Sequence, residues 1–116
     1  MNAKRAAKLI RIARYYGEEK QLCKLSEELG EAVSAASELQ MLLSFREDSG
    51  KEKDLQERME HLAEELADVQ NVAEQVLYLF GLELDFKVAR QRGIDKTIKR
   101  IEEEEHARET KSGLSE

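Results

Sequence analysis

The sequence contains no proline and no tryptophan, and its aromatic residues are limited to three tyrosines and three phenylalanines. β-Sandwiches and β-barrels need many turns, which are often built with proline and glycine, so the lack of proline argues against both classes. Hydrophobic residues make up 41% and charged residues 38% of the 116 residues, a profile typical of long helices. The composition therefore predicts an all-α protein of one domain's length.

A single cysteine, Cys23, excludes an internal disulfide and fits a reducing compartment. No apolar run approaches the roughly 20 residues that span a bilayer, and the N-terminus lacks the apolar core and cleavage site of a signal peptide. We therefore expect a cytoplasmic protein with no membrane partner. The net charge of −6 argues against a nucleic-acid partner, because neutralising phosphates requires a basic surface. The basic side chains of residues 3–16 are expected to face solvent rather than a membrane surface or a polyanion.

Apolar residues recur at three- and four-residue steps through most of the chain, which predicts amphipathic helices. The expected helices span residues 3–16, 18–45, 53–80 and 83–106. Gly17 and Gly81 are the expected stops of the first and third of these, and Gly93 either kinks or divides the last one. The polar stretch 44–50 predicts a loop, whose shortness favours an antiparallel pairing of the two long helices.

These elements predict an antiparallel bundle of four to five helices. We expect a single domain over residues 1–108, followed by a flexible polar tail at residues 109–116. A few long helices on so short a chain bury little core by themselves. We therefore expect oligomerisation to complete the core.

Two short acidic motifs, Glu28-Leu-Gly-Glu31 and Glu65-Leu-Ala-Asp68, lie within the apolar stripes of the two longest helices. Glu28 and Glu65 each follow a leucine by three residues and precede another apolar residue by four, so they share its face. In an antiparallel pair of helices the two motifs can face each other near mid-helix. Burying unpaired carboxylates costs several kcal/mol per ion, and like charges one turn apart repel each other.

The carboxylates have two interpretations. They are either charged positions in a charge-rich chain, relieved in part by bases such as Lys24, or ligands of a cation that relieves all the repulsion. Carboxylate sites without histidine or cysteine suit hard cations rather than zinc. The second interpretation therefore predicts Mg²⁺, for which Mn²⁺ can substitute, at the four motif carboxylates: Glu28, Glu31, Glu65 and Asp68.

Three further polar residues are candidate substrate contacts. Lys96 and Arg100 are four residues apart and share a face of the last helix, where they can meet phosphates or be solvated. Asn71, three residues after Asp68, can bond a ligand or a metal-bound water, or simply face solvent.

The stretch Lys-Leu-Ser-Glu-Glu-Leu-Gly-Glu at residues 24–31, followed by Glu-Glu-Leu-Ala-Asp-Val at residues 64–69, resembles the MazG-like all-α nucleoside triphosphate pyrophosphohydrolase superfamily. Its members carry an ExxE and an ExxD motif on consecutive helices, and the resemblance covers about residues 15–101. It implies a helical homodimer or homotetramer in which the four motif carboxylates hold Mg²⁺ and serve catalysis. The implied reaction hydrolyses (deoxy)nucleoside triphosphates to the monophosphate and pyrophosphate, with Lys96 and Arg100 on the phosphates.

The chain also departs from this pattern. Residues 32–64, between the motifs, form a longer segment than in many members, and the chain lacks the tryptophan that holds the base in some of them. Tyr15, Tyr16 or Phe45 could stack a base instead, and nothing in the sequence selects one. The alternative function is a non-catalytic helical dimer that acts as a binding or regulatory module. The intact carboxylate set favours the enzyme, because such a module would have no reason to keep four mutually repelling groups.

Overall fold

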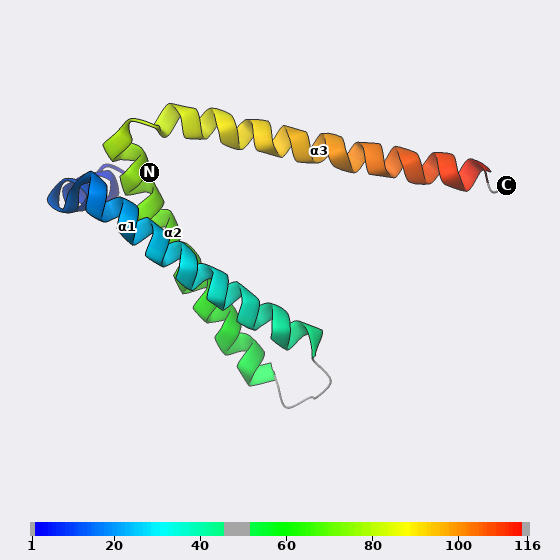
Figure 1. The fold of residues 1–116 in the computed structure, drawn as a ribbon, viewed down its shortest axis with the longest axis horizontal. Helices are drawn as coiled ribbons and strands as arrows, with labels where there is room; N and C mark the ends of the chain where they lie inside the picture. Colours follow the sequence, from blue (N-terminus) through cyan, green and yellow to red (C-terminus); the bar gives the residue numbers. More distant parts are fainter. Residues whose placement is uncertain (1, 46–51, 115–116) are drawn as a thin grey trace. The chain divides into compact units, whose positions relative to one another are not determined.

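A computed structural model describes residues 2–45 and 52–114 of the chain. Three helices follow one another: α1 (Ala3–Ser44), α2 (Glu52–Phe80) and α3 (Glu83–Leu114) (Figure 1). No strand occurs in these described residues, so the prediction of an all-α protein is confirmed. Most of the predicted loop at 44–50 lies outside them. None of the helices, over the same residues, carries an apolar stretch long enough to cross a membrane.

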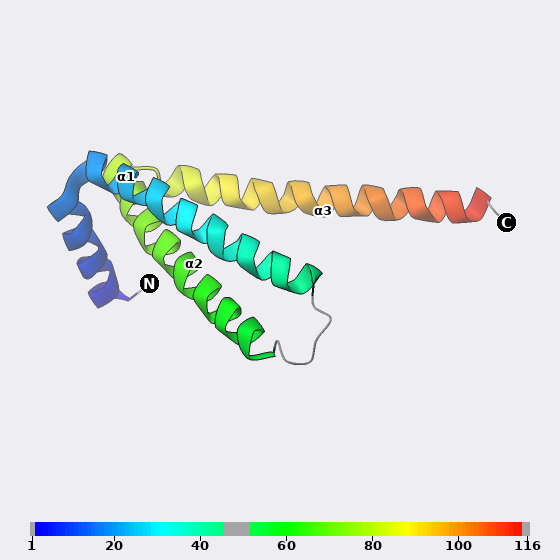
Figure 2. The same ribbon diagram turned by 60° about the horizontal axis from the view of Figure 1, so that its bottom comes forward.

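A break at Gly17 divides α1 into two helical segments. Gly17 has φ 84° and ψ 175°, a backbone conformation that is essentially restricted to glycine. The helix therefore stops after Tyr16 and starts again in a new direction (Figure 2), as the sequence predicts. At its beginning, the Asn2 side chain caps α1 by accepting a hydrogen bond from the backbone N–H of Arg5 at 2.8 Å.

The segment of α1 after Gly17 and the whole of α2 form an antiparallel hairpin. The two helices lie side by side and run in opposite directions in both views (Figures 1 and 2). Small apolar side chains fill the contact between them: Ala32, Ala35, Val72 and Val76 are buried. Small residues let the two backbones approach closely, and this close approach also buries the polar side chains that share the same stripe.

The segment of α1 before Gly17 packs against the C-terminal half of α2. Ala13 is completely buried there. The Arg5 guanidinium lies 3.4 Å from a carboxylate oxygen of Glu74, and the Arg14 guanidinium lies 5.8 Å from the ring centroid of Tyr78. These contacts fix the first segment beside α2.

The hairpin leaves much of its apolar surface exposed. Leu22, Leu29, Val33 and Leu66 are 44%, 47%, 65% and 53% exposed, respectively. All four belong to the stripes from which the sequence predicts long amphipathic helices. The stripes are wider than a single neighbouring helix can cover, so burying them fully needs further helices.

The chain divides into two compact units, Met1–Gly81 and Leu82–Glu116, and α3 forms the described part of the second. Gly81, with φ 66°, ends α2 as predicted. The third helix continues through Gly93 and reaches Leu114, beyond the predicted end at residue 106. All its described side chains are exposed, including apolar residues at helical spacing: Leu84, Val88, Ile94, Ile98 and Ile101.

Candidate metal centre

Three of the four motif carboxylates meet in the hairpin. Glu28 and Glu31 come from α1 and Glu65 from α2, and one oxygen of each lies within 4.8 Å of the others. The Glu28 side chain is only 7% exposed and that of Glu65 13% exposed, whereas Glu31 is exposed. The antiparallel register of the helices brings these residues together, because Glu28 and Glu65 both lie on the stripe where α1 and α2 meet.

Two oxygens of this cluster are buried without a partner. Glu28 Oε2 and Glu65 Oε2 accept no hydrogen bond from any of the described residues. The second oxygen of each carboxylate lies near a base: Lys24 Nζ is 3.1 Å from Glu28 Oε1, and His61 Nδ1 is 3.8 Å from Glu65 Oε1. Buried carboxylate oxygens are nearly always hydrogen-bonded or bound to a metal, so the two unpartnered oxygens call for a donor or a cation.

The gathered charges also shift proton affinities. The pKa of Glu31 is raised above its ordinary value of 4.5, first by the negative charge of Glu28, then by desolvation and by the charge of Glu65. The pKa of Lys24 is raised above 10.5, mainly by its hydrogen bond to Glu28 and by the charge of Glu27. The negative carboxylates around Glu28 contribute to both shifts.

The donor set fits a hard divalent cation. It consists of carboxylates alone, which suits Mg²⁺ or Mn²⁺ and not the softer metals that prefer sulfur and nitrogen. Two of the three groups are held in place by burial, while the exposed Glu31 keeps one side of the cluster open to solvent. Glu28, Glu31 and Glu65 could therefore hold the cation and leave room for a substrate.

The other predicted site residues are all exposed. Asp68, one turn after Glu65, is exposed and is not among the gathered carboxylates. Asn71 is exposed as well. Lys96 and Arg100 are exposed on α3, in the second compact unit.

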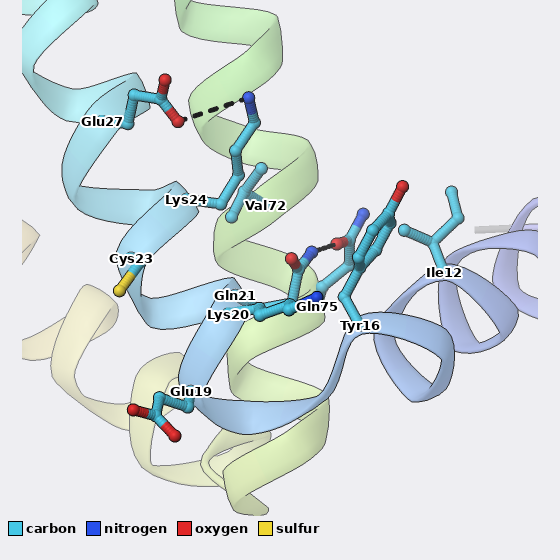
Figure 3. A pocket seen from close by; sticks show the side chains of 10 residues that line it. All are labelled: Ile12, Tyr16, Glu19, Lys20, Gln21, Cys23, Lys24, Glu27, Val72 and Gln75. Atoms are coloured by element: carbon cyan, nitrogen blue, oxygen red, sulfur yellow. Dashed lines mark hydrogen bonds and ion pairs between the residues drawn. The ribbon is translucent and has the colours of Figure 1, made fainter.

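A cavity of about 760 Å³ adjoins the cluster, and the sequence pattern did not predict it. Its wall includes Lys24, the ion-pair partner of Glu28, together with two buried glutamines, Gln21 and Gln75 (Figure 3). Gln21 precedes Glu28 by two turns on the same face, and Gln75 lies between the buried Val72 and Val76. In the sequence, the signal for this cavity is a polar amide within the apolar stripe of each helix. It could be interpreted only after the pairing of the helices was known.

No family model, no curated protein and no solved structure matches this chain. A function is therefore inferred from the chain's own residues, chiefly the two buried carboxylate oxygens that lack partners.

Proposed function

We propose that this chain is a Mg²⁺-dependent nucleotide pyrophosphohydrolase that converts (deoxy)nucleoside triphosphates to the monophosphate and pyrophosphate. The observation that carries this proposal is the meeting of Glu28, Glu31 and Glu65 in the hairpin, with two of their oxygens buried and unpartnered. Carboxylate sites of this kind hold Mg²⁺, which typically also binds substrate phosphates. The order of the ExxE and ExxD motifs on two antiparallel helices supports the same assignment.

In the proposed reaction the oxygen of a water bonds to the phosphorus on one side of the bridge between the α- and β-phosphates, and the bond from that phosphorus to the bridging oxygen breaks. Glu28, Glu31 and Glu65 would hold the divalent cation, which would supply charge neutralisation at the phosphate oxygens and activation of the water. Glu28 and Glu65, which are held by burial, provide fixed carboxylate oxygens for that cation. Glu31, which is open to solvent, is the carboxylate best placed to accept the water's proton.

The basic residues would neutralise the substrate's charge. The Lys24 ammonium lies at the edge of the cluster, 3.1 Å from Glu28 Oε1, where it can approach a phosphate oxygen. Lys96 and Arg100 share a face of α3 and keep their proposed role on the phosphates. Asp68 and Asn71, exposed on α2 beyond Glu65, remain proposed contacts to the cation and the substrate.

The proposed enzyme works in the cytoplasm as a homodimer or homotetramer whose bundle contains four to five helices. The exposed stripe residues support this assembly, since Leu22, Leu29 and Val33 would be covered by further helices. Their burial would add apolar contact that the isolated hairpin lacks.

Pyrophosphate release tests the proposal. The protein is incubated with a panel of ribo- and deoxyribonucleoside triphosphates and Mg²⁺, then with Mn²⁺, and pyrophosphate is measured. We expect release that Glu65→Gln abolishes and Glu64→Gln preserves, because Glu64 is the exposed neighbour outside the cluster. If no nucleotide gives release above the Glu65→Gln background, the protein is not this enzyme, and the alternative of a non-catalytic binding module gains support.

A further inference from the structure

The cavity of about 760 Å³ is formed by the bend of α1 at Gly17. Ile12 and Tyr16 come from the segment before the bend, Gln21 and Lys24 from the segment after it, and Val72 and Gln75 from α2. Figure 3 shows these side chains arranged around the Gln21–Gln75 pair, while Glu19 and Cys23 point away from it. The cavity thus combines an aromatic ring, apolar surface and a pair of amides.

The amide pair has hydrogen-bonding capacity to spare. Gln21 and Gln75 are 4% and 5% exposed, and Gln21 Nε2 donates a hydrogen bond to Gln75 Oε1. This bond leaves Gln21 Oε1 as an acceptor and Gln75 Nε2 as a donor, and neither has a partner among the described residues. Neither atom is among the buried side-chain atoms that lack a partner in the described residues, so both reach the open space of the cavity, where they can pair with a ligand that offers a donor beside an acceptor.

The cavity and the carboxylate cluster share a wall. Lys24 lines the cavity, and its ammonium is 3.1 Å from Glu28 Oε1 in the cluster. Gln21 precedes Glu28 by seven residues, or about 10 Å along the helix. A ligand that fills the cavity and also reaches the cluster would therefore extend over about 10 Å, with a group at one end that suits the amides and a group at the other that binds cations.

We propose that this cavity binds the base of the nucleoside triphosphate, with the Gln21–Gln75 pair on the base's hydrogen-bonding edge and Tyr16 against its face. The inference rests on the proposed function and adds the base-binding site to it. Nucleobases place an N–H or amino donor next to a ring nitrogen or carbonyl acceptor, which matches the spare groups of the pair. Tyr15 packs edge-on against Tyr16 with ring centroids 4.9 Å apart, which restrains the Tyr16 ring for stacking.

The pair also determines how selective this site is. If both amides rotate together, their mutual hydrogen bond survives with its direction reversed, and the spare donor and acceptor exchange places. The pair can therefore match either order of donor and acceptor on a base edge. It favours nucleotides over plain polyphosphates without choosing strongly among the bases.

Calorimetric binding in the presence of Mg²⁺ tests the site. The ligands are the α,β-methylene analogues of ATP, GTP, CTP and UTP, which resist hydrolysis at that bridge, and inorganic tripolyphosphate, which lacks a base. The wild-type protein is expected to bind at least one analogue about tenfold or more tightly than tripolyphosphate, the scale of one aromatic stacking contact. The double variant Gln21→Met/Gln75→Met should lose that preference and keep its affinity for tripolyphosphate.

The double variant is preferable to either single substitution, because it replaces both hydrogen-bonding partners with apolar side chains of similar length. It therefore leaves no single amide without a partner. Tyr16→Leu, at a residue that is 49% exposed, gives a second measurement if the double variant does not fold. It too should weaken binding of the analogues only. Glu65→Gln should weaken binding of the analogues and of tripolyphosphate alike.

Two results overturn the inference, and they are distinguishable. If the foldable cavity variants bind the analogues as tightly as the wild type while Glu65→Gln weakens them, the base does not bind in this cavity and the proposed function stands. If the wild type binds neither the analogues nor tripolyphosphate in the presence of Mg²⁺, the proposed function fails and this inference fails with it.

Discussion

Lys24 Nζ lies 3.1 Å from Glu28 Oε1, one turn away on α1. The same ammonium is 3.5 Å from a carboxylate oxygen of Glu27, and these contacts raise the pKa of Lys24 above its ordinary value of 10.5. Lys24 therefore supplies positive charge to a carboxylate that we propose as a cation ligand. The lysine and the cation would bind the same carboxylate and repel each other, so removing the lysine should change the affinity for the cation.

Lys24→Met should lower the stability of the metal-free protein and raise its affinity for the metal. Without metal, the variant leaves the buried Glu28 carboxylate with no ion-pair partner, so its melting temperature should fall by several degrees. Its affinity for Mn²⁺, measured by calorimetry or by the electron paramagnetic resonance of the free ion, should rise. The variant removes the repulsion between two cations and leaves the whole charge of the Glu28 carboxylate to the metal.

Lys53→Met is the matched control for this experiment. Lys53 is exposed near the start of α2, twelve residues or about 18 Å before Glu65 along the helix, so the variant should bind Mn²⁺ as the wild type does. If Lys24→Met and Lys53→Met have the same Mn²⁺ affinity, Lys24 does not compete with the cation at Glu28.

The carboxylates should differ in their importance for metal binding. Glu65→Gln and Glu28→Gln remove oxygens of the buried cluster and should each weaken Mn²⁺ binding about tenfold or more, at least the loss caused by changing an outer-shell partner. Asp68→Asn should weaken it less, because Asp68 is exposed and lies outside the cluster. A loss at Asp68 as large as that at Glu65 would mean that Asp68 is a full ligand in the metal-bound protein.

Much of the fold follows from the sequence, because local signals determine it. The breaks at Gly17 and Gly81 are predicted correctly, since the left-handed backbone regions used there favour glycine. Gly93 carried the same local signal but lies inside a continuous helix. A glycine in a helix interior costs only about 1 kcal/mol, so the residues around Gly93 are sufficient to keep the helix intact.

The candidate site is predictable only in part. Positions 28 and 65 are identifiable as inward-facing because they share a face with the leucine stripes, and both side chains are largely buried. The exposure of Asp68 depends on how α2 is rotated against α1, which the periodicity of one helix does not determine. The cavity around Gln21 and Gln75 depends in addition on the direction of the chain after Gly17. Such features arise from the pairing of helices, so a signal in one helix, such as an amide within its apolar stripe, cannot be interpreted from that helix alone.

The stability of the metal-free protein should depend on the charge of Glu31. Its pKa is raised above 4.5 in the folded protein, mainly by Glu28, so the folded state binds the Glu31 proton more tightly than the unfolded state does. Below the ordinary pKa the group is neutral in both states and costs nothing. As the pH rises through the raised pKa, the folded state gains a charge that its neighbours repel, and stability falls.

Glu31→Gln should therefore raise the melting temperature of the metal-free protein at pH 7, and this gain should shrink as the pH is lowered towards 4. With saturating Mg²⁺ the wild type should instead have the higher melting temperature, because it then gains a ligand bond that the variant lacks. Glu64→Gln, at the exposed residue outside the cluster, should show neither effect. If Glu31→Gln raised the melting temperature equally at pH 4 and pH 7, repulsion between the carboxylates would not be the cause of the gain.

Gly17→Ala should destabilise the protein, and Gly30→Ala should stabilise it. Gly17 has φ 84° and ψ 175°, so a side chain there costs about 1–3 kcal/mol in backbone strain, although an added Cβ would touch nothing within 4 Å. Gly30 lies inside the same helix with the same open space around its Cβ position. Alanine there should add about 0.5–1 kcal/mol by reducing the entropy of the unfolded chain. Denaturant unfolding of the two variants gives both values. Equal stability of the two variants would show that the bend is not maintained by the backbone preference of glycine.

Because the bend at Gly17 also carries Tyr16 to the cavity, Gly17→Ala should weaken binding of the nucleotide analogues more than binding of tripolyphosphate.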